Sequence, residues 1–218
     1  MRIGINGFGR IGRTVFRILN RQQDIDVAAI NDLANDDVLA YLLKYDTVMG
    51  PLKDSVSVKN GVLTTSNHSI KMLNKHDPAT LPWTELGVDV VIEATGVFRT
   101  REQLQSHLDA GAGYVILTVP AKDEIDYTVV IGVNEDRLTS DHKIISNASC
   151  TTNCLAPMAK VLNDAFGIEY GVINTIHAYT NDQRLADVPH SDWRRSRAAA
   201  ENIIPTTTGA ARAVGVVL

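Results

Sequence analysis

Hydrophobic residues in the first 149 positions alternate between short continuous runs and helically spaced faces. Segments with the periodicity of amphipathic helices cover residues 12–22, 37–46 and 100–112. Strands are predicted at residues 2–6, 25–32, 88–95, 113–119, 127–134 and 143–149, and an Asn60-Gly61 turn predicts a β-hairpin within 56–73. This strand–helix–strand alternation predicts an α/β domain with a doubly wound parallel sheet over residues 1–149.

The pattern changes at Cys150 and continues with a different order of elements. Residues 150–167 have an apolar helical face that ends at Gly167, and residues 170–180 read as a strand. Residues 181–200 are polar and basic, as in a long loop, and 209–218 resume a helical pattern that stops without a cap. We therefore expect residues 150–218 to be the first part of a second domain.

Composition and charge narrow the classes of function. The chain has 218 residues, is 44% hydrophobic and 21% charged, and carries a net charge of −4, so it has neither a nucleic-acid footprint nor a polybasic membrane surface. No apolar run is long enough for a transmembrane helix, and the N-terminus lacks the features of a signal peptide. The only two cysteines are four residues apart, a poor disulfide framework, which favours a cytoplasmic, reducing compartment.

A glycine-rich turn follows the first predicted strand. Gly7, Gly9 and Gly12 fit G-x-G-x-x-G between a strand and a helix. In a dinucleotide site the first glycine makes the tight turn, the second admits a pyrophosphate, and the third lets helix and strand pack closely. The N–H groups of Arg10 and Ile11 would then meet the phosphate oxygens at the positive end of the helix dipole.

Asp32 lies twenty residues beyond the last of these glycines, at the end of the second predicted strand. A carboxylate there accepts hydrogen bonds from the adenosine ribose hydroxyls and repels a 2′-phosphate, which favours NAD over NADP. The alternative is a cluster of packing glycines and a solvated aspartate. The agreement of strand, motif, helix and acid favours dinucleotide binding.

The two cysteines of "SNASCTTNC" differ in their predicted positions. Cys150 begins the predicted helix, where unpaired backbone donors and the helix dipole stabilise a thiolate nucleophile. Cys154, one turn later beside the apolar face, is interpreted as a small buried residue. His177 ends the next predicted strand and is a candidate base, although spacing alone leaves a surface or core histidine open. C-x₃-C without a second ligand pair is not a zinc spacing, so we expect no metal.

Four longer motifs, "INGFGRIGR", "SNASCTTNC", "HAYTNDQ" and "RRSRAAAENIIPTTTGAA", resemble phosphorylating glyceraldehyde-3-phosphate dehydrogenases. The resemblance runs in order along the whole chain. It implies a Rossmann-type NAD-binding domain at 1–149 and part of an α+β catalytic domain at 150–218. It also implies that Cys150 is the nucleophile and His177 its base.

Other site residues are carried over by the same resemblance. Pro189 matches a residue of NAD-using members, and His76 stands on the adenine side where many members have Arg. Cofactor positions carry over, beyond the glycine turn and Asp32, to Thr95, Gly96 and Thr118. Substrate and phosphate positions carry over to Ser149, Thr151, Thr180, Arg195, Thr208 and Gly209.

The implied function is the NAD-dependent oxidation and phosphorylation of glyceraldehyde 3-phosphate by inorganic phosphate, through a cysteine thioester, in glycolysis. The alternatives are erythrose-4-phosphate dehydrogenase and a non-catalytic NAD-binding fragment. The resemblance also implies a homotetramer with residues 181–200 at a subunit interface. Since family members continue beyond Leu218, we expect this span to have little turnover by itself.

Overall fold

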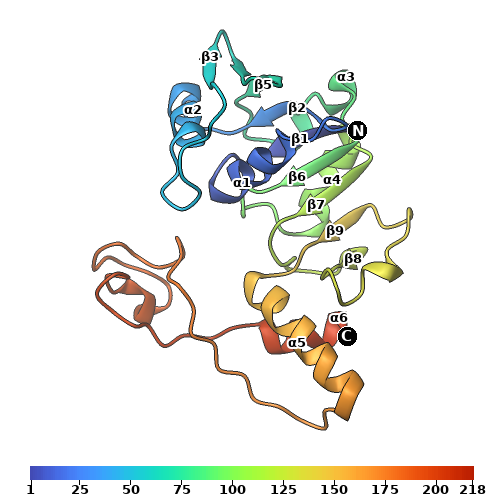
Figure 1. Cartoon of the computed structure of the whole chain (residues 1–218), viewed down its shortest axis with the longest axis vertical. Helices are drawn as coiled ribbons and strands as arrows, with labels where there is room; N and C mark the ends of the chain where they lie inside the picture. The colour runs from blue at the N-terminus through green and yellow to red at the C-terminus, as the bar shows by residue number, and fades with distance from the viewer. The chain divides into compact units, whose positions relative to one another are not determined.

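The computed structural model describes residues 1–218, which divide into two units, Met1–Ser149 and Cys150–Leu218. The first unit is built on a nine-stranded sheet of order β3-β4-β5-β2-β1-β6-β7-β9-β8 (Figure 1). Its strands are β1 (Arg2–Asn6), β2 (Asp26–Asn31), β3 (Ser57–Lys59), β4 (Val62–Thr64), β5 (Ser69–Leu73), β6 (Val90–Glu93), β7 (Tyr114–Leu117), β8 (Tyr127–Thr128) and β9 (Ile144–Ser146).

The strand order shows that the first unit is doubly wound. All neighbours from β5 to β8 pair in parallel, whereas β3, β4 and β5 pair antiparallel. The chain passes outward from β1 through β2 to β5, then returns to β6 on the other side of β1 and proceeds to β7 and β9. The reversal lies between β1 and β6, the position where such sheets bind ligands. The predicted fold class is therefore confirmed.

Helices cover both faces of this sheet because successive strand residues point to opposite sides. Ile5 and Ile92 pack on one face with Phe16 of the helix after β1. On the other face Val115 packs with Leu104 of the helix after β6. The helices of the unit are α1 (Arg10–Leu19), α2 (Asp36–Lys44), α3 (Trp83–Leu86) and α4 (Arg101–Asp109), with 3₁₀ turns η1 (Pro78–Thr80) and η2 (Glu135–Arg137).

The predicted hairpin forms the edge of the sheet. Asn60 and Gly61 both have positive φ angles, 53° and 70°, as a two-residue turn between twisted strands requires. They join β3 to β4, which pairs in turn with β5. The hairpin prediction over residues 56–73 is confirmed.

The second unit contains α5 (Cys150–Phe166), the 3₁₀ turn η3 (Trp193–Ser196) and α6 (Ala210–Val217). α5 and α6 pack together, with Ala156 and Ala210 buried. Both helices confirm the predicted periodic segments. The strand predicted at 170–180 is wrong: this segment has no regular structure, and Val172 and Ile176 are 96% and 97% exposed. A strand needs a neighbour for its backbone groups, and none pairs with this segment.

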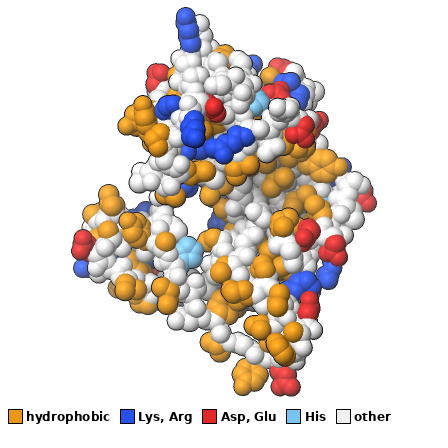
Figure 2. Space-filling model, viewed as in Figure 1, with side chains coloured by type: hydrophobic (Ala, Val, Ile, Leu, Met, Phe, Trp, Pro, Cys, Tyr) orange, Lys and Arg blue, Asp and Glu red, His pale blue; other side chains and the backbone are white.

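The apolar face predicted for α5 is largely open. Leu162 and Phe166 are 52% and 84% exposed, and hydrophobic side chains are visible at the surface along this helix (Figure 2). The helix forms at the predicted residues, but only positions such as Thr152 and Ala156 are buried. No helix in the structure has both the length and the apolar character needed to cross a membrane.

Candidate functional site

A cavity of about 450 Å³ opens at the carboxyl ends of β1, β2 and β6, where the strand order reverses. Asn6 ends β1, Asn31 ends β2, and Ala94 follows β6, so three parallel strands deliver their next residues to one place. The lining residues are Asn6, Gly7, Gly9, Asn31, Asp32, Leu33, Lys75, His76, Ala94, Thr95, Val97 and Phe98. We call this cavity the cleft.

The glycine turn forms part of the cleft wall, and its three glycines meet different constraints. Gly7 has φ of +92°, and a Cβ there would lie 2.5 Å from the backbone nitrogen of Thr95. A Cβ at Gly12 would overlap the carbonyl oxygen of Gly7. At Gly9 no atom lies within 4 Å of such a Cβ, so a side chain there would fill open space beside the cleft. This arrangement fits a backbone that a pyrophosphate approaches closely.

Helix α1 begins at Arg10 with its N-terminus beside the cleft. Gly9 supplies no side-chain cap, and the first intrahelical bond is donated by the N–H of Arg13 to the carbonyl of Gly9. The N–H groups of Arg10 and Ile11 therefore have no acceptor within the helix and carry its positive dipole end. These are the donors that an anion would meet.

The side chain of Arg10 is held at an ion pair with the buried carboxylate of Asp46. The pKa of Asp46 is lowered to about 2, chiefly by the hydrogen bond from the N–H of Met49. Burial raises this pKa, whereas the N–H of Val48 and the guanidinium of Arg10 lower it further. The guanidinium of Arg10 therefore binds the loop that follows α2, and only the backbone of Arg10 faces the cleft.

Asp32 directly follows β2, and its carboxylate joins the glycine turn to the loop after β2. Its Oδ2 accepts the N–H of Phe8 at 2.7 Å, and its Oδ1 accepts the N–H of Ala34 at 2.9 Å. A carboxylate oxygen has room for a second donor, so both oxygens can still accept ribose hydroxyls. The side chain lines the cleft, as the predicted role requires.

The other predicted cofactor residues are at or near the same cleft. Thr95 and His76 line it, and Gly96, with φ of +71°, makes the turn after Thr95. Thr118 donates both its N–H and its hydroxyl to the carbonyl oxygen of Glu93, each at 3.1 Å. Glu93 is not predicted from the sequence, and neither are the cleft residues Asn6, Asn31, Leu33, Lys75, Ala94, Val97 and Phe98. A usable signal existed for the two asparagines, which end strands directly before Gly7 and Asp32.

In the second unit, the structure brings Cys150 and His177 together. Cys150 is the first residue of α5, and its Sγ lies 3.3 Å from Nε2 of His177. The Nδ1 of His177 lies 2.7 Å from the carbonyl oxygen of Ala178, so Nδ1 carries the proton and Nε2 faces the thiol. This is the arrangement of a nucleophile and its base.

The electrostatics of the pair favour charge separation. Burial raises the pKa of the Cys150 thiol, but His177 and the N–H and hydroxyl of Thr151 outweigh it, and the pKa is lowered from its usual value. The hydrogen bond to Ala178, followed by that to Cys150, raises the pKa of His177. Both shifts move the pair toward thiolate and imidazolium, the reactive form of a cysteine.

The interpretation of Cys154 as a buried residue is wrong. Cys154 is exposed, as is Cys150, and both thiols are free. On α5 the buried positions are Thr152 and Ala156, and Cys154 lies two residues from each. Because a helix turns about 200° over two residues, Cys154 points away from that face.

The predicted phosphate residues fall into separate local structures. Thr180 accepts the N–H of Asp182, whose carboxylate pairs with Arg195, and Arg195 donates to Thr206 at 3.1 Å. Thr208 accepts the N–H of Ala210 at the start of α6, with Gly209 as the N-cap residue. Thr151 lies beside Cys150 in the first turn of α5, and Ser149 is the last residue of the first unit.

Comparison with known proteins identifies the family. The model described as "Glyceraldehyde 3-phosphate dehydrogenase, NAD binding domain" matches residues 1–101, and that family's C-terminal domain model matches 149–218. The chain is 56% identical to glyceraldehyde-3-phosphate dehydrogenase of Streptomyces coelicolor over 220 residues, which covers 100% of the chain and 65% of the relative. Its counterparts are 56% identical in Geobacillus stearothermophilus (100% and 65% covered) and 57% identical in Thermotoga maritima (99% and 65%). The chain thus spans about 65% of the length of these relatives.

We predict that iodoacetamide labels Cys150 before Cys154 as the pH is raised toward neutrality. Since both thiols are exposed, access does not distinguish them, and the thiol with the lowered pKa becomes a thiolate first. Replacing His177→Asn removes the hydrogen bond and the positive charge, so the pH midpoint of Cys150 labelling should rise toward ordinary cysteine, about 8.5. Peptide mass spectrometry across a pH series measures both rates.

In this experiment Cys154→Ser serves as the control, because it should leave the labelling profile of Cys150 unchanged. Faster labelling of Cys154, or a profile of Cys150 that His177→Asn does not move, would contradict the assignment of a paired nucleophile.

Proposed function

Because this chain belongs to the glyceraldehyde-3-phosphate dehydrogenase family, we propose that it oxidises and phosphorylates glyceraldehyde 3-phosphate with NAD, in glycolysis. The observation that carries this proposal is the 3.3 Å contact between Cys150 and His177 in a chain that also has a dinucleotide cleft. A thiolate with a base suits acyl chemistry on an aldehyde, and a dinucleotide suits its oxidation.

The proposed first stage uses the charge-separated pair. The Cys150 thiolate adds to the aldehyde carbon, and the carbonyl π electrons move to oxygen, which takes the proton from Nε2 of His177. The N–H of Cys150 at the start of α5 can stabilise the negative charge that develops on this oxygen. When hydride leaves the hemithioacetal carbon, His177 takes the hydroxyl proton back, and the product is a thioester on Cys150.

The proposed second stage transfers the acyl group. Inorganic phosphate attacks the thioester carbon, the C–S bond breaks, and the thiolate of Cys150 returns as an acyl phosphate leaves. Two phosphate groups must be held, the substrate's own and the attacking one. The hydroxyls of Ser149, Thr151, Thr180 and Thr208, the Gly209 backbone and Arg195 are the proposed donors for them, since hydroxyl, N–H and guanidinium groups are strong phosphate partners.

The cleft residues are proposed to hold the dinucleotide by its separate parts. Arg10 and Ile11 would donate backbone N–H groups to the pyrophosphate, Asp32 would accept the adenosine ribose hydroxyls, and His76 would lie on the adenine side. The end of the dinucleotide away from the adenine would lie against Thr95, Gly96 and Thr118. When bound, NAD supplies the acceptor for the hydride that leaves the substrate.

The assembly and location of the protein are part of the same proposal. We place it in the cytoplasm, as two free cysteines fit a reducing compartment. We also propose a homotetramer with residues 181–200 at a subunit interface. Exposed apolar side chains in this segment support the interface, because Leu185 and Trp193 are each 86% exposed.

We predict that the chain binds NAD at least about tenfold more tightly than NADP, and that Asp32→Asn removes most of this preference. The carboxylate repels a 2′-phosphate, whereas the neutral amide does not. Isothermal titration with both dinucleotides gives the two affinities. Asp24→Asn makes the same charge change at an exposed position outside the cleft and should keep the preference. Equal affinities in the unaltered chain would remove Asp32 from this role.

We predict that a chain extended to the relatives' length forms NADH from glyceraldehyde 3-phosphate, NAD and phosphate, whereas residues 1–218 have little turnover per subunit. Chemistry at Cys150 requires its partners to be positioned closely, and small misplacements cost orders of magnitude in rate. His177→Asn should lower the rate of the extended chain by about 10²- to 10⁴-fold, and Cys150→Ser should abolish it. NADH absorbance measures these rates.

Erythrose 4-phosphate is the matched substrate control in this assay. Faster oxidation of erythrose 4-phosphate, or no NADH from either aldehyde, would overturn the proposed function. Equal turnover by the 218-residue and extended chains would contradict the expected effect of length.

We predict a tetramer for the extended chain in solution, measured by light scattering at micromolar concentration. Replacing Trp193→Ser should weaken the assembly, because it removes an exposed aromatic side chain from the proposed interface. Ile131→Ser, which changes a 70%-exposed apolar side chain of the first unit, outside both the cleft and residues 181–200, is the control and should leave the assembly unchanged. A stable monomer at this concentration would contradict the proposal.

A further inference from the structure

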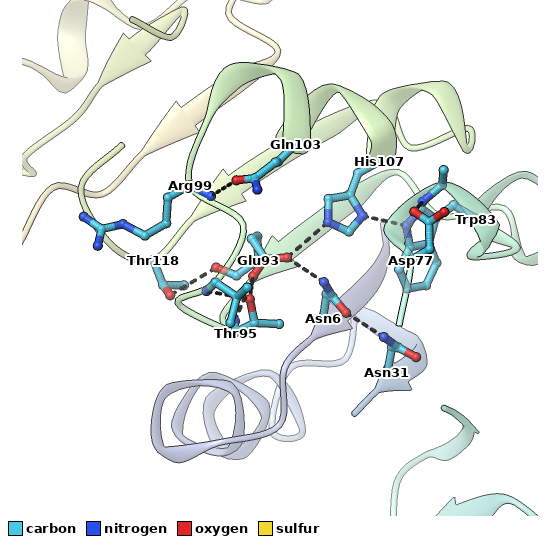
Figure 3. A network of polar contacts seen from close by, with 12 residues as sticks. Asn6, Asn31, Asp77, Trp83, Glu93, Thr95, Arg99, Gln103, His107 and Thr118 are labelled. Carbon is cyan, nitrogen blue, oxygen red and sulfur yellow. Dashed lines mark hydrogen bonds and ion pairs between the residues drawn. The ribbon is translucent and has the colours of Figure 1, made fainter. Parts of the chain in front are cut away.

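Glu93 is fully buried at the end of β6, and four donors surround its carboxylate (Figure 3). Oε1 accepts the N–H of Thr95 at 2.8 Å and also its hydroxyl. Oε2 accepts an N–H of the Asn6 amide at 2.6 Å and lies 3.1 Å from Nε2 of His107. The buried carboxylate is thus surrounded by hydrogen bonds from neutral groups rather than by Lys or Arg.

Trp83 sets the direction of the hydrogen bond between His107 and this carboxylate. Its indole N–H, which can only donate, points to Nδ1 of His107 at 3.1 Å. Nδ1 must therefore be the acceptor, and the proton of the neutral ring sits on Nε2, facing Glu93. Both Trp83 and His107 are fully buried, and neither lines the cleft.

The direction continues into the wall of the cleft formed by β1 and β2. Since Asn6 gives an N–H to Glu93, its Oδ1 is the atom that accepts an N–H from Asn31, at 2.7 Å. The Oδ1 of Asn31 then accepts the N–H of Lys75 at 2.8 Å. The amide nitrogen of Asn31 also donates to the carbonyl oxygen of Lys75 at 2.9 Å, so the main chain of Lys75 orients Asn31 while the buried carboxylate orients Asn6. Asn6, Asn31 and Lys75 all line the cleft, so this wall is joined to Glu93 through the amide of Asn6.

The opposite wall depends on the same residue. The hydroxyl of Thr95 donates its hydrogen bond to Glu93. Its Oγ1 can therefore only accept from other groups, and it accepts the N–H of Val97 at 3.0 Å. This bond closes the turn through Gly96. The main-chain carbonyl of Glu93 holds Thr118 by two hydrogen bonds. Glu93 thus anchors both segments that border this wall.

We propose that Trp83, His107 and Glu93 are positioning residues for the dinucleotide, acting as a directed relay of hydrogen bonds that orders both walls of the cleft. The proposal rests on the proposed function, because it takes the cleft to bind NAD. The relay assigns a role in cofactor affinity to three side chains, none of which lines the cleft.

The test measures NAD affinity by isothermal titration for variants of the full 218-residue chain. Glu93→Gln replaces one of the two carboxylate oxygens by an NH₂ group. The two groups that donate to that oxygen in the unaltered chain would then face a donor instead of an acceptor. His107→Leu removes the donor to Oε2. Each should weaken NAD binding by about 10- to 100-fold, the range expected for a buried hydrogen bond to a charged group. His107→Gln, which can still place an N–H near Oε2, should recover most of the affinity.

Thr65→Val is the matched control for loss of stability alone. Thr65 is buried in the same unit, donates to Asn20 at 2.7 Å and does not line the cleft. This variant should lower the melting temperature and leave the dissociation constant for NAD unchanged. The comparison separates a positioning role from a purely structural one.

A spectroscopic measurement on the unaltered chain tests the direction of the relay without relying on a variant's folding. The ¹⁵N resonances of His107, assigned by their loss in His107→Gln, should show a proton on Nε2 and an acceptor at Nδ1. A proton on Nδ1 of the neutral ring would overturn the relay.

The affinity outcomes are distinguishable from failure of the proposed function. If the unaltered chain binds NAD and the His107 variants bind it equally well while melting lower, the relay is overturned and the function stands. If the unaltered chain does not bind NAD at millimolar concentration, the cofactor assignment fails and the relay fails with it.

Discussion

A buried carboxylate must be surrounded by donors, and Glu93 meets this requirement with groups from both sides of the sheet's reversal point. Its partners therefore cannot move independently. Thr95 is held on one wall of the cleft and Asn6 on the other, and His107 lies behind them. An apolar side chain would be easier to bury at this position. The cost of burying this polar group is offset by hydrogen bonds to residues that line the cleft.

The cleft is formed by residues from several distant parts of the chain, whereas the thiol pair is formed by only two residues. The cleft needs three parallel strands to end at one edge, a left-handed turn at Gly7 and the close approach of Gly12 to the strand. Its residues come from positions 6 to 98 of the chain. The thiol pair needs only the first turn of α5 and His177, whose Nδ1 is held by the neighbouring carbonyl. The first unit thus contributes a binding surface assembled from several strands, and the second a reactive thiol whose pKa is lowered by local hydrogen bonds.

Apolar patterns in the second unit require partners that the described residues do not supply. The 170–180 run has strand composition, yet no strand pairs with it, and its backbone takes no regular form. The apolar face of α5 has the expected periodicity, yet Phe166 remains exposed. The periodicity of a segment shows which of its faces is apolar. Whether that face is buried depends on another element that packs against it. A helix can form without a packing partner because its backbone hydrogen bonds are internal, whereas a strand needs a neighbouring strand for them.

The sequence by itself determined the doubly wound fold, the Asn60-Gly61 hairpin and the helix that begins at Cys150, because periodicity and turn chemistry are local properties. It also singled out Asp32 and the glycine turn, since their spacing follows from one strand–helix–strand unit. Only the tertiary structure decided that His177 faces Cys150 and that Cys154 is exposed. Only it revealed the connection from Trp83 through His107 to Glu93, because those contacts join residues far apart in the chain and leave no periodic or compositional signal.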